Sequence, residues 1–189
     1  MGYDVRIRHI SDADWTGIVA LEASAYTDSA LSEGRAALES RAHASPATCF
    51  VLDFEQRMAG YLLALPYPMF RYPDLSRAEE IAFRSRNLHL HDLVIAEGLR
   101  GRGLAKRLLQ HLTATAGPRM YERISLVAVG GSEAFWSANG YIAHRGVALP
   151  ASYGTNAVYM SKAVQRGRAE KPTPADEPPR GSPPEDETG

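Results

Sequence analysis

The amino-acid sequence predicts an α/β protein, an α+β mixed sheet in which antiparallel strands flank a central strand–helix unit. Residues 5–10 alternate apolar and charged side chains, as a half-buried strand does. An apolar strand over 88–95 is followed closely by a helical pattern over 103–116, which is typical of a strand–helix unit. Residues 124–129 are continuously apolar, which indicates a strand in the middle of a sheet.

The strands and helices are expected in the order β-α-α-β-β-β-α-β-α-β-β. The first helix begins at a capping box made by Ser11 and Asp14, and Ser32 is expected to cap the second helix. The helix over 103–116 carries leucines on one face and ends at a Gly-Pro pair. The remaining strands are expected over 49–55, 58–66, 141–147 and 157–164, with a short helix over 132–139.

Length and composition indicate one domain, residues 1–164, followed by a tail. The chain has 189 residues, of which 44% are hydrophobic, and this is enough to form one hydrophobic core. Its net charge is −1. Residues 165–189 hold six of the twelve prolines and no Leu, Ile, Phe, Trp or Tyr. Such a segment cannot bury enough apolar area to offset its ordering entropy, so a disordered tail is expected.

The same totals limit the partners and the compartment. Balanced charge gives no reason to expect nucleic acid or a membrane surface as the main partner. The single cysteine, Cys49, excludes an internal disulfide framework and a zinc site built from several cysteines. The first residues, MGYDVRIRHI, read as a charged strand and not as a signal peptide, so a cytoplasmic location is expected.

The segment LVIAEGLRGRGLAKRLLQ, residues 93–110, places two glycines and two arginines where a strand passes into a helix. A helix N-terminus exposes unpaired N–H groups and a partial positive charge, and glycines let that backbone approach a ligand. These features predict an anion site for a phosphate or pyrophosphate. The segment is neither a P-loop nor a dinucleotide fingerprint. A plain helix cap with solvated arginines is the alternative.

The run from Arg100 to Ala105, RGRGLA, resembles the Q/R-x-x-G-x-G/A signature of the GNAT superfamily of acyl-CoA-dependent N-acyltransferases. The later segment AFWSANGY, residues 134–141, resembles a helix whose sequence in this family is often A-x-x-F-Y-x-x-x-G-F. The resemblance covers about residues 3–164. It implies the GNAT fold, with acetyl-CoA or a related acyl-CoA as cosubstrate.

The resemblance also implies where the cosubstrate binds. The N–H groups of the signature loop would hold the pyrophosphate, and the preceding strand would splay from the next one and pair with the pantetheine arm. The implied cofactor-binding residues are Leu93, Val94, Ile95, Arg100, Gly101, Arg102, Gly103, Leu104, Ala105 and Trp136.

His89 and His91 stand two apart on the strand over 88–95, so period-2 geometry predicts both imidazoles on one face. Asp92 is expected on the other face unless a bulge intervenes. The histidines fit a general base that deprotonates an amine, or a structural pair bonded to neighbouring groups. A metal site is a third alternative, but no third ligand stands at a recognisable spacing. HLHDLVI is similar to the H-x-H-x-L-A-V stretch of the arylalkylamine N-acetyltransferases, which implies that both histidines serve proton removal, partly through water.

Two positions depart from the family pattern. Asp92 stands where a small residue is usual, and it could orient a histidine, bind the substrate ammonium or face another element. Trp136 stands where many members carry a tyrosine that protonates the thiolate. Tyr153 is the candidate that replaces that tyrosine, with Tyr141 and Tyr159 as further candidates, and packing is the alternative role for each.

A long segment over 66–87 separates two expected strands and is rich in aromatic residues. Tyr67 and Phe70 are expected to form one wall for the body of an amine. Tyr26, with Asp28 and Glu33 nearby, is expected on the opposite wall, where a carboxylate attracts an ammonium. Packing over the sheet, or a dimer contact, is the alternative role of the long segment.

These features together predict an N-acetyltransferase that transfers the acetyl group of acetyl-CoA to a small primary amine, such as an arylalkylamine or polyamine. The amine is expected to attack directly in a ternary complex, without a metal. The alternatives are a protein lysine or N-terminal acetyltransferase and a non-catalytic acyl-CoA-binding module. The expected partner is a small-molecule amine, without nucleic acid or membrane, and the chain is expected to be a monomer or homodimer.

Overall fold

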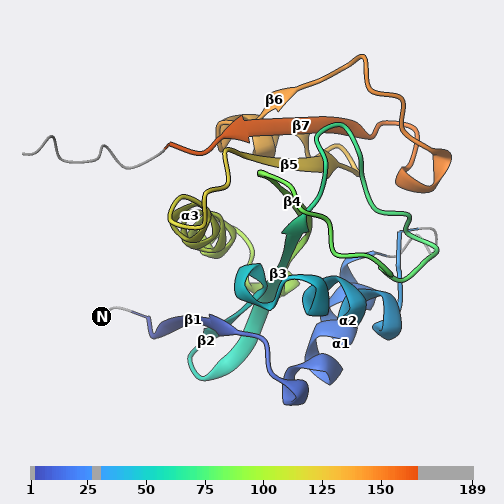
Figure 1. Cartoon of the computed structure of the whole chain (residues 1–189). Helices are drawn as coiled ribbons and strands as arrows, with labels where there is room; N and C mark the ends of the chain where they lie inside the picture. The colour runs from blue at the N-terminus through green and yellow to red at the C-terminus, as the bar shows by residue number, and fades with distance from the viewer. Residues whose placement is uncertain (1–2, 27–30, 166–189) are drawn as a thin grey trace, which may run out of the picture.

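A computed structural model describes residues 3–26 and 31–165, which form one mixed seven-stranded sheet with helices on both faces (Figure 1). The strand order across the sheet is β1-β2-β3-β4-β5-β7-β6. The elements are β1 (Val5–His9), α1 (Trp15–Ala25), α2 (Arg35–Ala44), β2 (Phe50–Phe54), β3 (Arg57–Pro66), β4 (Asn87–Ile95), α3 (Leu104–Ala116), β5 (Arg123–Ala128), α4 (Glu133–Ala138), β6 (Ile142–Ala143) and β7 (Val158–Ala163). The predicted fold class and element order are confirmed. The predicted tail lies, apart from Gln165, outside the described residues.

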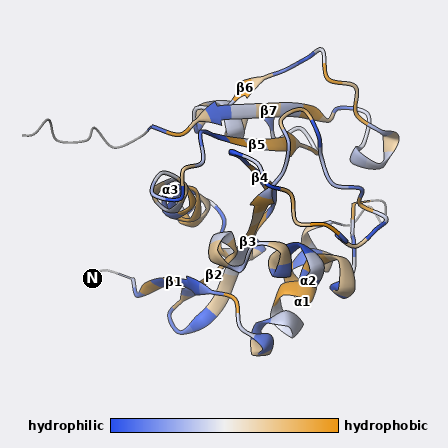
Figure 2. Cartoon of the chain, viewed as in Figure 1, coloured by the Kyte–Doolittle hydropathy of each residue, from blue (hydrophilic) through white to orange (hydrophobic). Residues whose placement is uncertain are grey.

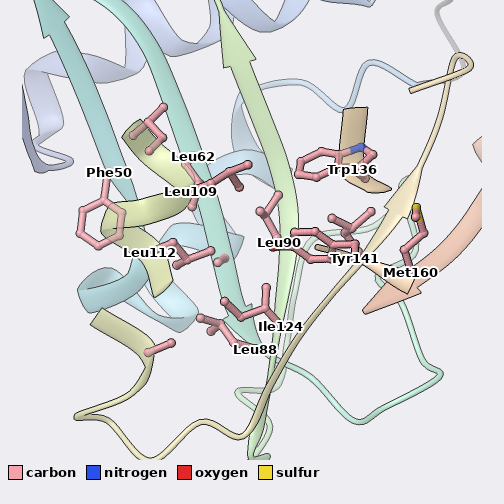
Figure 3. Packing of buried hydrophobic residues seen from close by; sticks show 14 of the residues in the cluster. Phe50, Leu62, Leu88, Leu90, Leu109, Leu112, Ile124, Trp136, Tyr141 and Met160 are labelled. Atoms are coloured by element: carbon pink, nitrogen blue, oxygen red, sulfur yellow. The ribbon is translucent and has the colours of Figure 1, made fainter. Parts of the chain in front are cut away.

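Two apolar layers hold the helices to the sheet. On one face, α3 and α4 supply Leu109, Leu112 and Trp136 to an apolar cluster with residues of β2, β3, β4, β5 and β7, as the close view shows (Figure 3). On the other face, α1 and α2 pack on β2 and β3 around Ile18 and Leu38. Figure 2 shows the apolar character of β3 and β5; residues of β3 pack in both layers, and residues of β5 pack in the layer under α3 and α4. Within 3–26 and 31–165, no helix is long and apolar enough to cross a membrane.

Two sequence predictions about element ends are wrong. Ser32 does not cap the second helix, because its hydroxyl donates to the Glu22 carboxylate at 2.8 Å and Gly34 occupies the N-cap position. The strand predicted over 141–147 is reduced to the two residues of β6. The His144 N–H still reaches the Tyr159 carbonyl at 2.8 Å, but the chain then turns back through a bond from the Val147 N–H to the His144 carbonyl.

The parallel pair of β4 and β5 separates partway along its length. Only Asn87, Leu88 and His89 of β4 pair with β5. Beyond His89, the edge of β4 that faces β5 has no strand partner among the described residues. The sheet therefore opens between the carboxyl half of β4 and β5, as the family resemblance of the sequence implied.

A β-bulge in β4 changes which side chains face the first two helices. Leu63 of β3 lies opposite Asp92, while Ala64 lies opposite Leu90, so His91 is the extra residue. A bulge of this kind directs two successive side chains to the same side. The sequence placed Asp92 on the face away from His91 unless a bulge intervened; the bulge does intervene, and both side chains face the side of α1 and α2.

Candidate active site

A cavity of about 800 Å³ occupies the opening between β4 and β5. It extends from the N-terminus of α3 to the segment that joins α1 to α2 and to the long β3–β4 loop. The predicted site residues that line it are Tyr26, His91, Asp92, Leu93, Val94, Ile95, Arg100, Gly101, Gly103, Leu104, Ala105, Trp136 and Tyr153. Most of the residues chosen from sequence therefore meet in one place.

The α3 end of the cavity is shaped for an anion attached to an extended chain. Gly101 and Gly103 have φ angles of 77° and 76°, and a Cβ at either position would meet no atom within 4 Å. The first hydrogen bond of α3 runs from the Arg107 N–H to the Gly103 carbonyl at 3.1 Å, so the N–H groups just before Arg107 have no acceptor within the helix. A pyrophosphate fits this helix start. The unpaired edge of β4 fits a pantetheine arm bound as an added strand.

The two arginines of the loop are used differently. Arg100 lines the cavity, and its Nε donates to the Ile95 carbonyl at 3.3 Å, which ties the loop to the end of β4. The Arg102 guanidinium instead lies 5.8 Å and 5.7 Å from the ring centroids of Tyr3 and Phe54. Arg102 does not line the cavity, so its side chain is not placed for the cosubstrate contact that the sequence suggested.

His91 lies at the opposite end of the cavity and is held by a carboxylate. Its Nε2 bonds to Oε2 of Glu33, and its side chain is 3% exposed. Burial alone would raise the pKa of Glu33, but His91 and Arg41 together hold it below its ordinary value. Glu33 is therefore an acceptor, so Nε2 carries the proton that is donated. In the neutral imidazole, His91 Nδ1 is then a lone-pair acceptor, and it is buried without a hydrogen-bond partner in the part of the chain that the structure describes.

Asp92 is a buried carboxylate held by two tyrosines. The Tyr26 hydroxyl donates to Oδ1 at 2.6 Å and the Tyr61 hydroxyl donates to Oδ2. Asp92 is 5% exposed, and burial outweighs these two hydrogen bonds and raises its pKa. Over residues 3–26 and 31–165 it forms no ion pair with Lys, Arg or His. The carboxylate therefore lacks a compensating cation at the cavity wall.

His89 is not in the cavity. It is 1% exposed, its Nδ1 lies 3.1 Å from Ser125 Oγ, and its ring centroid is 6.3 Å from that of His91. Burial lowers its pKa well below the ordinary value, so it is neutral. Of the two predicted histidines, only His91 lines the cavity.

The aromatic wall predicted from the long β3–β4 loop is not part of this cavity. Tyr67 is buried against Phe83, with ring centroids 4.5 Å apart, and Phe70 is 52% exposed and packs on His144. The same loop supplies Leu75 to the wall instead. Of the opposite wall, Tyr26 and Glu33 line the cavity, and the remaining predicted residue, Asp28, lies outside the described residues.

Each tyrosine predicted to protonate the thiolate leaving group either already donates its hydroxyl proton to a protein group or lies outside the cavity. Tyr153 lines the cavity, but its hydroxyl donates to the Pro73 carbonyl at 2.6 Å and burial raises its pKa. The Trp136 indole N–H donates to Ser132 Oγ at 3.1 Å. Tyr141 and Tyr159 do not line the cavity. No tyrosine among the residues that form the cavity wall presents a free hydroxyl proton at the α4 side.

The end of the cavity that is lined by Glu33, His91 and Asp92 is called the acceptor end below. Sequence reasoning missed several residues that organise it. Arg41 reads as part of a polar helix, yet it is fully buried and bonded to Glu33 and Glu79. Tyr61 stands in an otherwise apolar strand, and that isolated hydroxyl is the one signal that pointed to a polar partner. No group of three His, Cys, Asp or Glu suited to a metal occurs in the described part of the chain.

A helix start that fits an anion, an unpaired strand edge and a carboxylate-held histidine are the features expected of an acyl-CoA-dependent N-acyltransferase. The chain belongs to the GNAT acetyltransferase family, since the model described as "Acetyltransferase (GNAT) family" matches residues 15–141. As in that family, acetyl-CoA is the cosubstrate, and the α3 end of the cavity fits it. None of the curated proteins compared with the chain matched its sequence.

Several solved structures share the fold. Ard1 from Thermoplasma volcanium is 16% identical, with a TM-score of 0.69 over 85% of this chain and 98% of its own. The GphF GNAT-like decarboxylase in complex with isobutyryl-CoA is 20% identical, with a TM-score of 0.68 over 85% of this chain and 100% of its own. The ribosomal-protein-S18-alanine N-acetyltransferase from Escherichia coli is 13% identical, with a TM-score of 0.59 over 89% of this chain and 99% of its own. At these identities the likeness establishes the fold.

Proposed function

We propose that this protein is an N-acetyltransferase for a small primary amine, and that His91 is its general base. The observation that carries the proposal is the bulge in β4, which brings His91 and Asp92 to the same cavity wall; the buried Nδ1 of His91 has no hydrogen-bond partner among the described residues. A primary amine is mostly protonated at neutral pH, so it needs a group that attracts an ammonium and a group that removes a proton. The two side chains supply these two functions.

The proposed reaction is a direct transfer in a ternary complex. Acetyl-CoA supplies an activated acyl group, held along β4 and at the start of α3. The substrate ammonium binds beside Asp92, and His91 Nδ1 takes its proton while Glu33 stabilises the resulting imidazolium. The neutral amine then attacks the thioester carbonyl, the C–N bond forms as the C–S bond breaks, and the second amine proton passes to the departing thiolate or to solvent. Because Tyr153 is bonded to Pro73, we assign it to the acceptor wall in the described state and expect the thiolate to leave without its help.

The long β3–β4 loop favours a small acceptor over a polypeptide. The Tyr72 hydroxyl donates to the Ala148 carbonyl at 2.8 Å, and the Tyr153 hydroxyl donates to the Pro73 carbonyl. On its other side, the loop is joined to α2 through a bond from the Glu79 N–H to Ser40 Oγ at 2.8 Å. The loop thus ties the segment before β7 to α2 across the acceptor end, where an extended peptide would need an open groove.

The walls of the acceptor end support an amine with an apolar body. Leu31, Leu75 and the Tyr153 ring line the cavity near His91. An arylalkylamine matches these apolar walls, and the likeness of HLHDLVI to the arylalkylamine branch agrees with it. A polyamine would use the acidic groups but leave the apolar wall without a partner. We therefore put arylalkylamines first.

The test is thiol release from acetyl-CoA over a panel of arylalkylamines, polyamines, amino acids and lysine or N-terminal peptides. Turnover concentrated on arylalkylamines is expected. Turnover on peptides alone would overturn the substrate proposal and favour a protein acetyltransferase, the activity in the name of the Escherichia coli neighbour. Binding of coenzyme A with no turnover of any acceptor would favour a non-catalytic module.

The matched variants are His91→Gln and His89→Gln, two histidines on the same strand. Loss of the general base at His91 is expected to lower kcat/KM for the amine about 100-fold or more. Higher pH should restore part of the rate, because the fraction of neutral amine rises. His89→Gln is expected to cost much less, since His89 lies outside the cavity. Equal losses in the two variants would contradict the assignment of the base.

A further inference from the structure

Arg41 in α2 is fully buried, and each of its three guanidinium nitrogens donates at least one hydrogen bond. Its Nε donates to Oε1 of Glu33 at 3.0 Å, and Nη1 donates to Oε1 of Glu79 at 2.6 Å. Nη2 also bonds to Glu33 and donates to the carbonyls of Asp74 at 2.9 Å and Arg77 at 3.2 Å. A guanidinium is tolerated in the interior only with such a full set of acceptors. Arg41 is therefore not free to bind a ligand.

Glu33 divides its two oxygens between Arg41 and the proposed base. Oε1 accepts from Arg41, and Oε2 accepts from Nε2 of His91. The orientation of this carboxylate decides which imidazole nitrogen carries the proton. With Glu33 turned as it is, Nε2 is the donor, and in the neutral imidazole Nδ1 is left as the acceptor, buried in a side chain that lines the cavity.

The same guanidinium fixes the loop that forms the acceptor wall. The carbonyls of Asp74 and Arg77 and the carboxylate of Glu79 all belong to the β3–β4 loop. Leu75, which lines the cavity, lies between the two bonded carbonyls in sequence. One buried side chain thus joins the base and the wall that contacts the acceptor.

We propose that Arg41 is a positioning residue, which orients Glu33 so that His91 presents Nδ1 to the amine and holds Leu75 at the acceptor wall. This inference rests on the proposed function, because it assigns a role relative to His91 as base. Arg41 acts through Glu33 and the loop and does not touch the reacting atoms.

The charges around His91 determine the pH effect to expect. The titratable or charged groups that share its surroundings are Glu33 before α2, Arg41 from α2, Tyr26 from α1, His89 and Asp92 from β4, and Tyr153 before β7. Arg41 is the one fixed cation in this set. Replacing it with an uncharged residue removes a positive charge that disfavours protonation of the imidazole, so the acid limb of the kcat/KM profile should move to higher pH.

The experiment compares Arg41→Met with Arg41→Lys, and uses Arg35→Met as a matched control. Arg35 lies on the same helix and forms an exposed ion pair with Glu39. Arg41→Met is expected to lower kcat/KM for the amine about 100-fold, as misplacement of a catalytic group does, with the KM for acetyl-CoA unchanged. Arg41→Lys should keep the wild-type acid limb and recover part of the rate. Arg35→Met should match the wild type in every readout.

NMR of the histidine side chains gives a readout that does not depend on turnover. The folded wild-type protein should show His91 with its proton on Nε2, and Arg41→Met should show a mixture of tautomers. A folded Arg41→Met protein with the wild-type tautomer, pH profile and amine KM would overturn the inference. If His91→Gln is inactive and Arg41→Met is not impaired, only the role of Arg41 fails. If His91→Gln is also unimpaired, the proposed base itself is wrong.

Glu79→Gln keeps the inference testable if the Arg41 variants do not fold. This change preserves the shape of the side chain and removes only the loop carboxylate bonded to Nη1. The amine KM should rise several-fold because Leu75 is held less firmly, while the tautomer of His91 stays as in the wild type. An unchanged amine KM in Glu79→Gln would count against a wall held through Arg41.

Discussion

At the scale of single residues, Asp92 is the most costly group in the acceptor end. A carboxylate that leaves water loses several kcal/mol of hydration unless a cation or a full set of hydrogen bonds replaces it. Asp92 receives two tyrosine hydroxyls and no ion pair from the described residues. A substrate ammonium would complete the set of partners, which gives the protein a physical reason to keep this charge at the cavity wall.

The raised pKa of Asp92 makes stability depend on pH in a defined direction. The folded protein binds this proton more tightly than the unfolded chain does, because burial raises the pKa. The stability from this group is fully present below the unfolded pKa of about 4, and it is lost as pH rises through the raised folded value. Asp92→Asn should remove this loss. Its Tm should fall less than that of the wild type as the pH is raised above about 4.

Thermal unfolding followed over a series of pH values measures this effect, with Asp4→Asn as the control because the Asp4 side chain is exposed. The same Asp92→Asn protein should have a higher KM for the amine and an unchanged KM for acetyl-CoA. A variant whose Tm follows the wild-type pH curve would show that Asp92 is ionised at little cost in the folded protein.

At the scale of elements, the loop before α3 depends on two residues with left-handed backbone. Gly103 is the N-cap of α3 with a φ of 76°, a conformation that costs an L-residue with a side chain roughly 1–2 kcal/mol. Gly103→Ala is therefore expected to lower the free energy of unfolding by about 1 kcal/mol. It should also raise the KM for acetyl-CoA, because the new methyl group projects from the proposed anion-binding backbone.

Gly98→Ala is the matched control for this loop. Gly98 has no positive φ, and a Cβ there meets no atom within 4 Å. Denaturant unfolding and the KM for acetyl-CoA should both stay at their wild-type values in Gly98→Ala. If Gly103→Ala behaves like this control, the left-handed backbone is not needed for cosubstrate binding.

Elements that are encoded by local pattern could be predicted from the sequence. The capping box is present, with the Ser11 N–H donating to the Asp14 carboxylate at 2.8 Å, and α3 begins one residue after the predicted start. The Ser32 prediction failed because a carboxylate on α1 competes for its hydroxyl. Local pattern identifies a potential cap, but not the distant group that takes it.

The candidate site likewise has one part that local sequence predicts and one part that it does not. Its main-chain half, the α3 start and the β4 edge, follows from a contiguous motif. Its side-chain half depends on contacts between distant segments, such as His91 with Glu33 and Asp92 with Tyr61, which lie 58 and 31 residues apart. The bulge at His91 is set by the register against β3, so the strand's own alternation could not show it.

At the scale of the whole molecule, the two ends of the cavity differ in charge although the chain carries a net charge of only −1. Arg100 and Lys106 line the end beside α3, where an anion is expected. Glu33 and Asp92 line the other end, and the buried Arg41 there bonds through all three of its nitrogens to Glu33, Glu79 and two loop carbonyls. This difference in charge fits an anionic cosubstrate at one end and the proposed cationic acceptor at the other.

This polarity predicts that the enzyme discriminates between an amine and the corresponding α-amino acid. Phenethylamine and phenylalanine share a ring and an amino group, but phenylalanine would bring a carboxylate close to Asp92 and Glu33. Like charges placed together in an interface cost several kcal/mol, so kcat/KM should favour phenethylamine about 100-fold or more. Phenylalaninamide has the same size as phenylalanine without the charge, and it should recover most of the rate. If phenylalanine and its amide react equally slowly, size and not charge limits the acceptor, and the acidic groups do not select the substrate.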